Sequence, residues 1–224
     1  MKPEEYYRTC LNSLAPGATG EWDMIADAYQ GRAYHNLDHL AEMVGHLNDG
    51  RLLKNFGPAP TVAPAPAPEK KPAVTRFKLQ HPAIFGLALI YHDIVYQAGR
   101  KDNEARSADL AVVALARLGA TANQQAYCRR LIMATKTHRA ATDDEGLLVD
   151  LDLAVLARSA NGYDAYTKAI RHEFRRYPGF LYRPGRRKAL RHFLEQPSIY
   201  HHEFFRQRWE DAARANLARE LKTL

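Results

Sequence analysis

The segment HPAIFGLALIYHDIVY, residues 81–96, constrains this chain more than any other stretch of its sequence. The residues from Pro82 to Tyr91 are uncharged and nearly all apolar, so no face of a helix formed by them would be polar. A helix that is apolar on every side is typical of the centre of a helical bundle. We therefore expect a buried core helix here, ending at the pair His92-Asp93.

Segments on both sides of this helix carry apolar residues at helical spacing. In HNLDHLAEMVGHL the apolar side chains share one face, as in an amphipathic helix. The same 3.6-residue pattern recurs in EWDMIADAYQ, ARSADLAVVALARLG, ANQQAYCRRLIMATKTH, EGLLVDLDLAVLAR, YDAYTKAIRHEFRRY, RPGRRKALRHFLEQ and FRQRWEDAARANLARELKTL. No alternating strand pattern competes with it. The sequence predicts an all-α fold.

A proline-rich stretch, GPAPTVAPAPAPEKKPAV at residues 57–74, interrupts the helical pattern. Proline lacks the backbone N–H and fixes an extended geometry, so this stretch cannot be a helix. With 224 residues the chain is long enough for one core. We expect a single domain over residues 1–224, with 57–74 as an exposed insertion that acts as a passive connector rather than as a docking site for a proline-recognising partner.

Composition narrows the class and the location. Hydrophobic residues make up 46% of the chain and charged residues 25%, which excludes wholesale disorder. The first residues are charged and no apolar run reaches the roughly 18 residues of a membrane helix, so we expect a cytoplasmic protein without membrane partners. Cys10 and Cys128 lack any CxxC spacing and are expected to be reduced structural thiols.

The formal net charge of +7 favours anionic partners without choosing among phosphorylated metabolites, nucleic acid and membranes. Much of the excess lies in RHEFRRYPGFLYRPGRRKALR, residues 171–191. A solvated helical surface accounts for this stretch best, because long basic side chains commonly cover apolar surface. A phosphate-binding rim is the alternative.

His92 and Asp93 are the residues most indicative of chemistry. A buried imidazole beside a buried carboxylate must be satisfied by partners or by a cation. The further ligands must come from other helices, and His39 and Asp152 are the natural candidates. Two imidazoles and two carboxylates suit one divalent ion, Mn, Fe, Co, Ni or Zn, or Mg with additional waters. His35 lies four residues before His39, so on a helix both would point into one pocket.

Taken together and in order, these residues resemble a known family. The HD superfamily has a first His on one helix, an HD pair on a later helix and a final Asp further on. RAYHNLDH, IYHDIVY, DNEARSADLA, LIMATKTH, VDLDLAVL, Tyr166 with IRHEF, and AARANLAREL resemble the predicted metal-dependent HD phosphohydrolases. The resemblance covers about residues 22–221 without the insertion, and it implies an HD-type helical bundle.

The segment YHNLDH is also similar to the YHNxxH segment of cyclic-nucleotide phosphodiesterases. That similarity implies His39 as a metal ligand and His35 as the proton donor to the leaving group. The final Asp of those enzymes precedes Leu and a small residue, which favours Asp152 over Asp150 as the ligand. Asp150 would then support a ligand or begin a helix.

The sequence also departs from the two-metal HD pattern, in which further histidines follow the HD pair. Asn103 stands near the place of one of them and His138 is a candidate for another, so we expect one tightly bound metal. Glu104 would orient the attacking water or hold a ligand, with helix capping by Asn103 and Glu104 as the alternative. Arg106, Lys136 and His138 are candidates for phosphate binding.

We therefore expect a metal-dependent phosphohydrolase acting on a small phosphate ester or nucleotide. A bound metal would lower the pKa of a water and polarise a phosphoryl oxygen, while His35 donates a proton. An inactive nucleotide sensor is the main alternative. A basic nucleic-acid-binding protein is the other, although it leaves His92-Asp93 unexplained. The oligomeric state stays open, with a homodimer as a working expectation.

Overall fold

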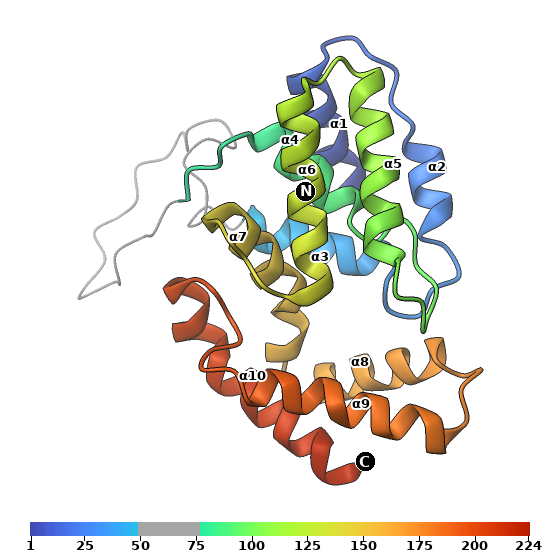
Figure 1. Ribbon diagram of the computed structural model, residues 1–224, viewed down its shortest axis with the longest axis vertical. Coiled ribbons are helices and arrows are strands. Elements are labelled where there is room, and N and C mark those ends of the chain that lie inside the picture. Colours follow the sequence, from blue (N-terminus) through green and yellow to red (C-terminus); the bar gives the residue numbers. More distant parts are fainter. Residues whose placement is uncertain (49–76) are drawn as a thin grey trace.

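The computed structural model describes residues 1–48 and 77–224, and the predicted insertion at 57–74 lies outside the described residues (Figure 1). The described ranges contain α-helices, one 3₁₀ helix and no strand, so the all-α prediction is confirmed. The elements are α1 (Pro3–Leu14), α2 (Trp22–Ala28), α3 (Leu37–Leu47), α4 (Pro82–Tyr91), α5 (Asn103–Arg117), α6 (Ala122–Thr137), α7 (Asp143–Asp152), η1 (Leu153–Ala157), α8 (Ala160–Glu173), α9 (Gly179–Leu194) and α10 (Glu203–Thr223).

The apolar helix α4 is the centre of the core, as its sequence predicts. Every residue from Ile84 to Tyr91 is buried, and α4 contacts α1, α3, α5 and α6. Burying a large apolar side chain contributes about 1.5–3 kcal/mol. The chain therefore has a strong driving force to place the end of α4, and with it His92, inside the protein.

Helix α1 was not among the predicted elements. Pro3 occupies its first turn, and Glu5 accepts a hydrogen bond from the Lys2 backbone N–H at 3.0 Å, both favourable at a helix start. Its buried face packs against α4 and consists of Tyr6, Tyr7, Cys10 and Leu11. The charged residues of the first turn obscured this short apolar face in the sequence.

Helix α3 begins two residues after His35, too late to carry both histidines. Asn36 is its N-cap, and the Asn36 side chain accepts hydrogen bonds from the backbone N–H groups of Asp38 (2.9 Å) and His39 (3.2 Å). His35 therefore precedes the helix. The prediction that a shared helical face aligns His35 with His39 is wrong, because the asparagine cap fixes the start of α3 after His35.

The C-terminal helices lie at the end of the molecule opposite α1, with α9 and α10 packed together and η1 against α10 (Figure 1). The segment EGLLVDLDLAVLAR forms α7 and then η1 rather than one helix. Helix α9 begins at Gly179, earlier than its pattern indicated, and contains Pro184. These helices share one continuous hydrophobic core with α1–α7, which makes the described chain a single domain.

Two further sequence features can be compared with the structure. Cys10 and Cys128 are buried and unbridged, and burial raises the pKa of each thiol to about 12. Both are therefore unreactive thiols, as predicted. Within the described residues, no helix combines the length and the apolar character needed to cross a membrane.

Candidate metal centre

Four predicted ligands from three helices converge on one point. His39 lies in the first turn of α3, His92 and Asp93 follow α4, and Asp152 ends α7. One ligand atom from each of His39, His92 and Asp93 lies within 4.8 Å of the others, so this buried group could hold a metal ion. Asp152 Oδ1 lies 3.1 Å from His39 Nε2 and 3.7 Å from His92 Nε2.

The two nitrogens of His92 have opposite environments. Nδ1 lies 2.8 Å from the Leu89 carbonyl oxygen, which can only accept, so Nδ1 carries the proton in the neutral ring. Nε2 is fully buried and has no hydrogen bond from the described residues, although Asp93 Oδ2 is 3.2 Å away. A buried nitrogen lone pair left unbonded between carboxylates fits a cation.

His39 is also oriented through its second nitrogen. Tyr34 Oη lies 3.1 Å from His39 Nδ1, and the Tyr34 ring packs edge-on against Tyr166. When the Tyr34 hydroxyl accepts from Nδ1–H, Nε2 is free to bind an ion. An outer hydrogen bond of this kind fixes the tautomer and the ring orientation of metal-binding histidines.

The electrostatics of the group reflect one buried and one partly buried carboxylate, Asp93 and Asp152, facing two imidazoles. Burial lowers the pKa of His92, but the charges and hydrogen-bonding capacity of Asp93 and Asp152 outweigh it and raise the pKa well above its usual value. Burial works in the opposite direction on the carboxylates, yet His92 lowers the pKa of Asp93, and His39 together with His92 lowers that of Asp152. The two carboxylates therefore favour a positive charge beside His92 Nε2, which a proton or a bound cation would supply.

Asp150 faces away from this group. Its fully buried carboxylate accepts hydrogen bonds from His201 N (2.7 Å), His202 N (2.9 Å) and His202 Nδ1 (2.8 Å). It lies near the end of α7, so it does not begin that helix. Asp150 instead connects α7 to the residues that precede α10, while Asp152 is directed toward the histidines.

His35 is paired with Glu173, a residue that the sequence analysis did not single out. Glu173 accepts hydrogen bonds from His35 Nδ1 (2.7 Å), His35 N (3.1 Å) and Tyr34 N (2.8 Å). Burial raises the pKa of Glu173, but the hydrogen bond and charge of His35 prevail and lower it to about 2. An ionised carboxylate only accepts, so Nδ1 is the donor and Nε2 remains the atom that gives or takes a proton.

Arg32 and Tyr96 hold His35 beside the candidate ligands. Arg32 donates to the carbonyl oxygens of Asp93 (2.5 Å), Ile94 (2.8 Å) and His35 (3.3 Å), which joins the two loops. Tyr96 stacks on the His35 ring with centroids 3.8 Å apart. The rings of His35 and His39 lie 6.3 Å apart, so proximity comes from tertiary contacts rather than from a common helix.

Asn103 and Glu104 begin α5 and have different surroundings. The Asn103 side chain accepts from Gln97 N (3.2 Å) and donates to Gln97 O (3.1 Å), so it secures the loop before α5. Burial raises the pKa of Glu104, the Glu104 backbone N–H lowers it, and the charges of Asp93 and Asp152 raise it further. Glu104 therefore lies within the electrostatic field of the group, whereas the polar atoms of Asn103 are engaged elsewhere.

The three predicted phosphate-binding residues differ in how they relate to the candidate metal group. His138 Nε2 is 3.8 Å from Asp152 Oδ2, and its backbone is left-handed at φ 52°. Lys136 is exposed, and its charge lowers the pKa of Glu104. Arg106 is exposed and lowers the pKa of Asp102. His138 and Lys136 thus lie near the group, while no contact connects Arg106 to it within the described residues.

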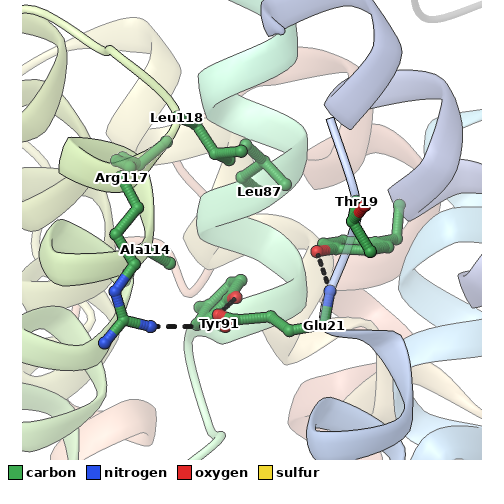
Figure 2. A pocket seen from close by; sticks show the side chains of 10 residues that line it. Thr19, Glu21, Leu87, Tyr91, Ala114, Arg117 and Leu118 are labelled. Carbon is green, nitrogen blue, oxygen red and sulfur yellow. Dashed lines mark hydrogen bonds and ion pairs between the residues drawn. The ribbon is translucent and has the colours of Figure 1, made fainter. Parts of the chain in front are cut away.

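Another pocket, of about 80 Å³, lies between the start of α2, α4 and α5 and contains none of the predicted site residues (Figure 2). Its polar groups bind one another: Tyr91 donates to Glu21 Oε1 at 2.5 Å, Glu21 N donates to Tyr7 Oη at 3.0 Å, and Arg117 lies 3.7 Å from Glu21. We interpret this pocket as a structural junction between α1, α2 and α4.

Comparison with known proteins gives no match, whether with protein-family models, curated proteins or solved structures. The helical fold and the His39, His92 and Asp93 group, which could hold a metal, are consistent with the HD resemblance. Membership of the family stays a prediction.

Proposed function

We propose that this protein is a metal-dependent phosphohydrolase that acts on a small phosphate ester, such as a nucleotide. The observation that carries the proposal is the buried Nε2 atom of His92, which has no hydrogen bond from residues 1–48 or 77–224 and faces His39, Asp93 and Asp152. Nitrogen and carboxylate donors in this combination suit a borderline divalent ion. When bound, such an ion lowers the pKa of a water and polarises a phosphoryl oxygen.

His35 would protonate the leaving oxygen. Glu173 holds His35 Nδ1 as a donor, so in the imidazolium form the proton on Nε2 is the one available for transfer. The Tyr96 ring stacked on His35 limits rotation of the imidazole. We assign Glu173 as a positioning residue, because it acts on the reaction only through His35.

Glu104 and Lys136 complete the proposed machinery. Glu104 would orient the water nucleophile, since its carboxyl is partly buried and lies in the field of Asp93 and Asp152. Lys136 would interact with the phosphate, because its charge acts on Glu104 and its side chain is exposed.

Hydrolysis of p-nitrophenyl phosphate and bis(p-nitrophenyl) phosphate tests the proposal, with chelated protein reloaded with Mn, Fe, Co, Ni, Zn or Mg. We expect activity with at least one ion. Because p-nitrophenolate leaves without being protonated, the His35→Gln variant is tested on adenosine 5′-monophosphate, whose alkoxide leaving group needs a proton, and its kcat there should fall by about 10²–10⁴-fold. Glu173→Gln should lower kcat with little change in KM. His172→Gln, an exposed histidine of the same helix, should retain activity.

The same metal-loaded protein samples distinguish an inactive nucleotide sensor from an enzyme. A metal-loaded protein that binds nucleotides and releases no phosphate or phenol from any tested ester would overturn the phosphohydrolase and support the sensor.

A further inference from the structure

A second cavity, of about 430 Å³, is lined by residues that contact His35. It is formed by the loop around Gly31-Arg32, the loop Tyr96–Ala98, and the end of α8 with the residues that follow it. Three of its lining residues contact His35 directly: Tyr96 by stacking, Glu173 by hydrogen bonds, and Arg32 through the His35 carbonyl oxygen. The cavity therefore adjoins the residues that position His35.

The cavity is strongly basic. Arg32, Arg175 and Arg176 line it, and Glu173 is its one acidic lining residue. Both carboxylate oxygens of Glu173 already accept hydrogen bonds from the backbone and ring of His35 and from the backbone of Tyr34. Within residues 1–48 and 77–224, neither Arg175 nor Arg176 has a carboxylate partner, and Arg175 Nη1 donates to the His172 carbonyl oxygen at 3.4 Å. The two guanidinium groups are thus available to an anion from outside.

The cavity walls are joined to each other. Tyr177 Oη donates to the Ala98 carbonyl oxygen at 3.5 Å, which connects the residues after α8 to the loop before α5. Gly99 has a φ of +85°, and a Cβ atom on it would clash with the Tyr177 hydroxyl. The glycine is therefore needed for the close approach of Tyr177, and the three segments form one site rather than an incidental surface hollow.

We infer that this arginine cavity binds a second, non-scissile phosphate group of the substrate, so the substrate class is a phosphate ester with two separate phosphates. The inference rests on the proposed function and deepens it. Guanidinium groups bind phosphate through paired hydrogen bonds, which explains two adjacent arginines here better than a general attraction of anions does. Arg32 adds charge, while its N–H groups are occupied by carbonyl oxygens.

Calorimetric titration of the metal-free full chain with inorganic pyrophosphate tests the site without requiring catalysis. We expect the double variant Arg175→Gln/Arg176→Gln to bind pyrophosphate at least tenfold more weakly than the native chain. The matched control is Lys188→Gln/Arg191→Gln, which removes two exposed positive charges from α9 and should change affinity less than twofold. Equal losses in the two variants, or no loss in the first, would overturn the inference.

A kinetic comparison separates failure of this inference from failure of the proposed function. Adenosine 3′,5′-bisphosphate should be hydrolysed with a higher kcat/KM than adenosine 5′-monophosphate, and Arg175→Gln/Arg176→Gln should abolish that preference. If this variant is an active metal enzyme and keeps the preference, the cavity does not bind the second phosphate. The proposed phosphohydrolase activity would still stand. Tight, arginine-dependent pyrophosphate binding by a chain inactive on every ester would refute the phosphohydrolase alone.

Discussion

His92 is held through Nδ1, so a proton and a metal ion compete for its Nε2 atom. The Asp93 and Asp152 carboxylates overcome burial and raise the pKa of the metal-free imidazole, which makes the proton a strong competitor. Because a metal binds only the deprotonated ring, each metal bound must displace this proton.

Metal affinity should therefore fall as the pH is lowered. Below the raised pKa of His92, the apparent association constant should decrease by about tenfold per pH unit for each proton displaced. Calorimetry with Zn or Mn in buffers of different ionisation enthalpy measures both the affinity and the proton release. An affinity that does not change with pH, without proton release, would be inconsistent with binding at His92.

Asp150 and Asp152 are two residues apart and should respond differently to the loss of their charge. Asp152→Asn should reduce metal content with a modest effect on folding, because Asp152 Oδ1 faces the two imidazoles. Asp150→Ala should leave three partly buried donors of His201 and His202 without their acceptor and cost about 2–4 kcal/mol. Metal analysis and urea unfolding of both variants measure this. If the Asp150 variant folded and it alone lost its metal, Asp150 rather than Asp152 would be the metal ligand.

Helix packing around α4 depends on one small residue. A Cβ atom at Gly86 would collide with the Cys10 sulfur and the Tyr6 ring of α1, whereas a Cβ atom at Gly45 in α3 would meet nothing within 4 Å. Helices α1 and α4 can therefore pack this closely only because position 86 is glycine.

Gly86→Ala should destabilise the protein by about 1–3 kcal/mol through overpacking. Gly45→Ala is the matched control, and it should be neutral or stabilise by up to about 1 kcal/mol because alanine favours a helix. Thermal unfolding of the two variants gives the comparison. Equal stability of both would mean that α1 does not pack against α4 as described.

Periodicity predicted most helices, because their apolar faces are strong local signals. It did not predict where they end. The start of α3 depends on the hydrogen bonds of Asn36, and the change from α7 to η1 follows Asp152 without a proline or glycine to mark it. The face of α1 is short and follows charged residues, so its pattern alone was too weak.

At the scale of the whole molecule, the sequence indicated the candidate ligands but not all of their partners. His92-Asp93 stood out because a polar pair ends an apolar helix. Glu173 lies 138 residues from His35, and no local pattern connects them. Such pairs arise only when distant helices pack. The basic stretch at residues 171–191 suggested a phosphate-binding rim only as the alternative to a solvated surface, because the pocket that Arg175 and Arg176 line also depends on distant segments of the chain.

A metal bound by His39, His92, Asp93 and Asp152 would join α3, α4 and α7. An ion that binds only the folded chain at 100 times its Kd stabilises it by about 2.7 kcal/mol. For a domain of this size, removal of the ion should lower the Tm by about 5–10 °C. Differential scanning calorimetry with and without a chelator measures the shift, and an unchanged Tm would argue against a site that spans three helices.

Elemental mass spectrometry of the purified chain tests the metal centre most directly, with His92→Ala and Asp93→Ala beside the control His172→Gln. We predict about one equivalent of a divalent transition metal in the native chain and in the control, and its loss in both folded site variants. A native chain that stays metal-free after incubation with Mn, Fe, Co, Ni and Zn, or site variants that keep the ion, would contradict the account.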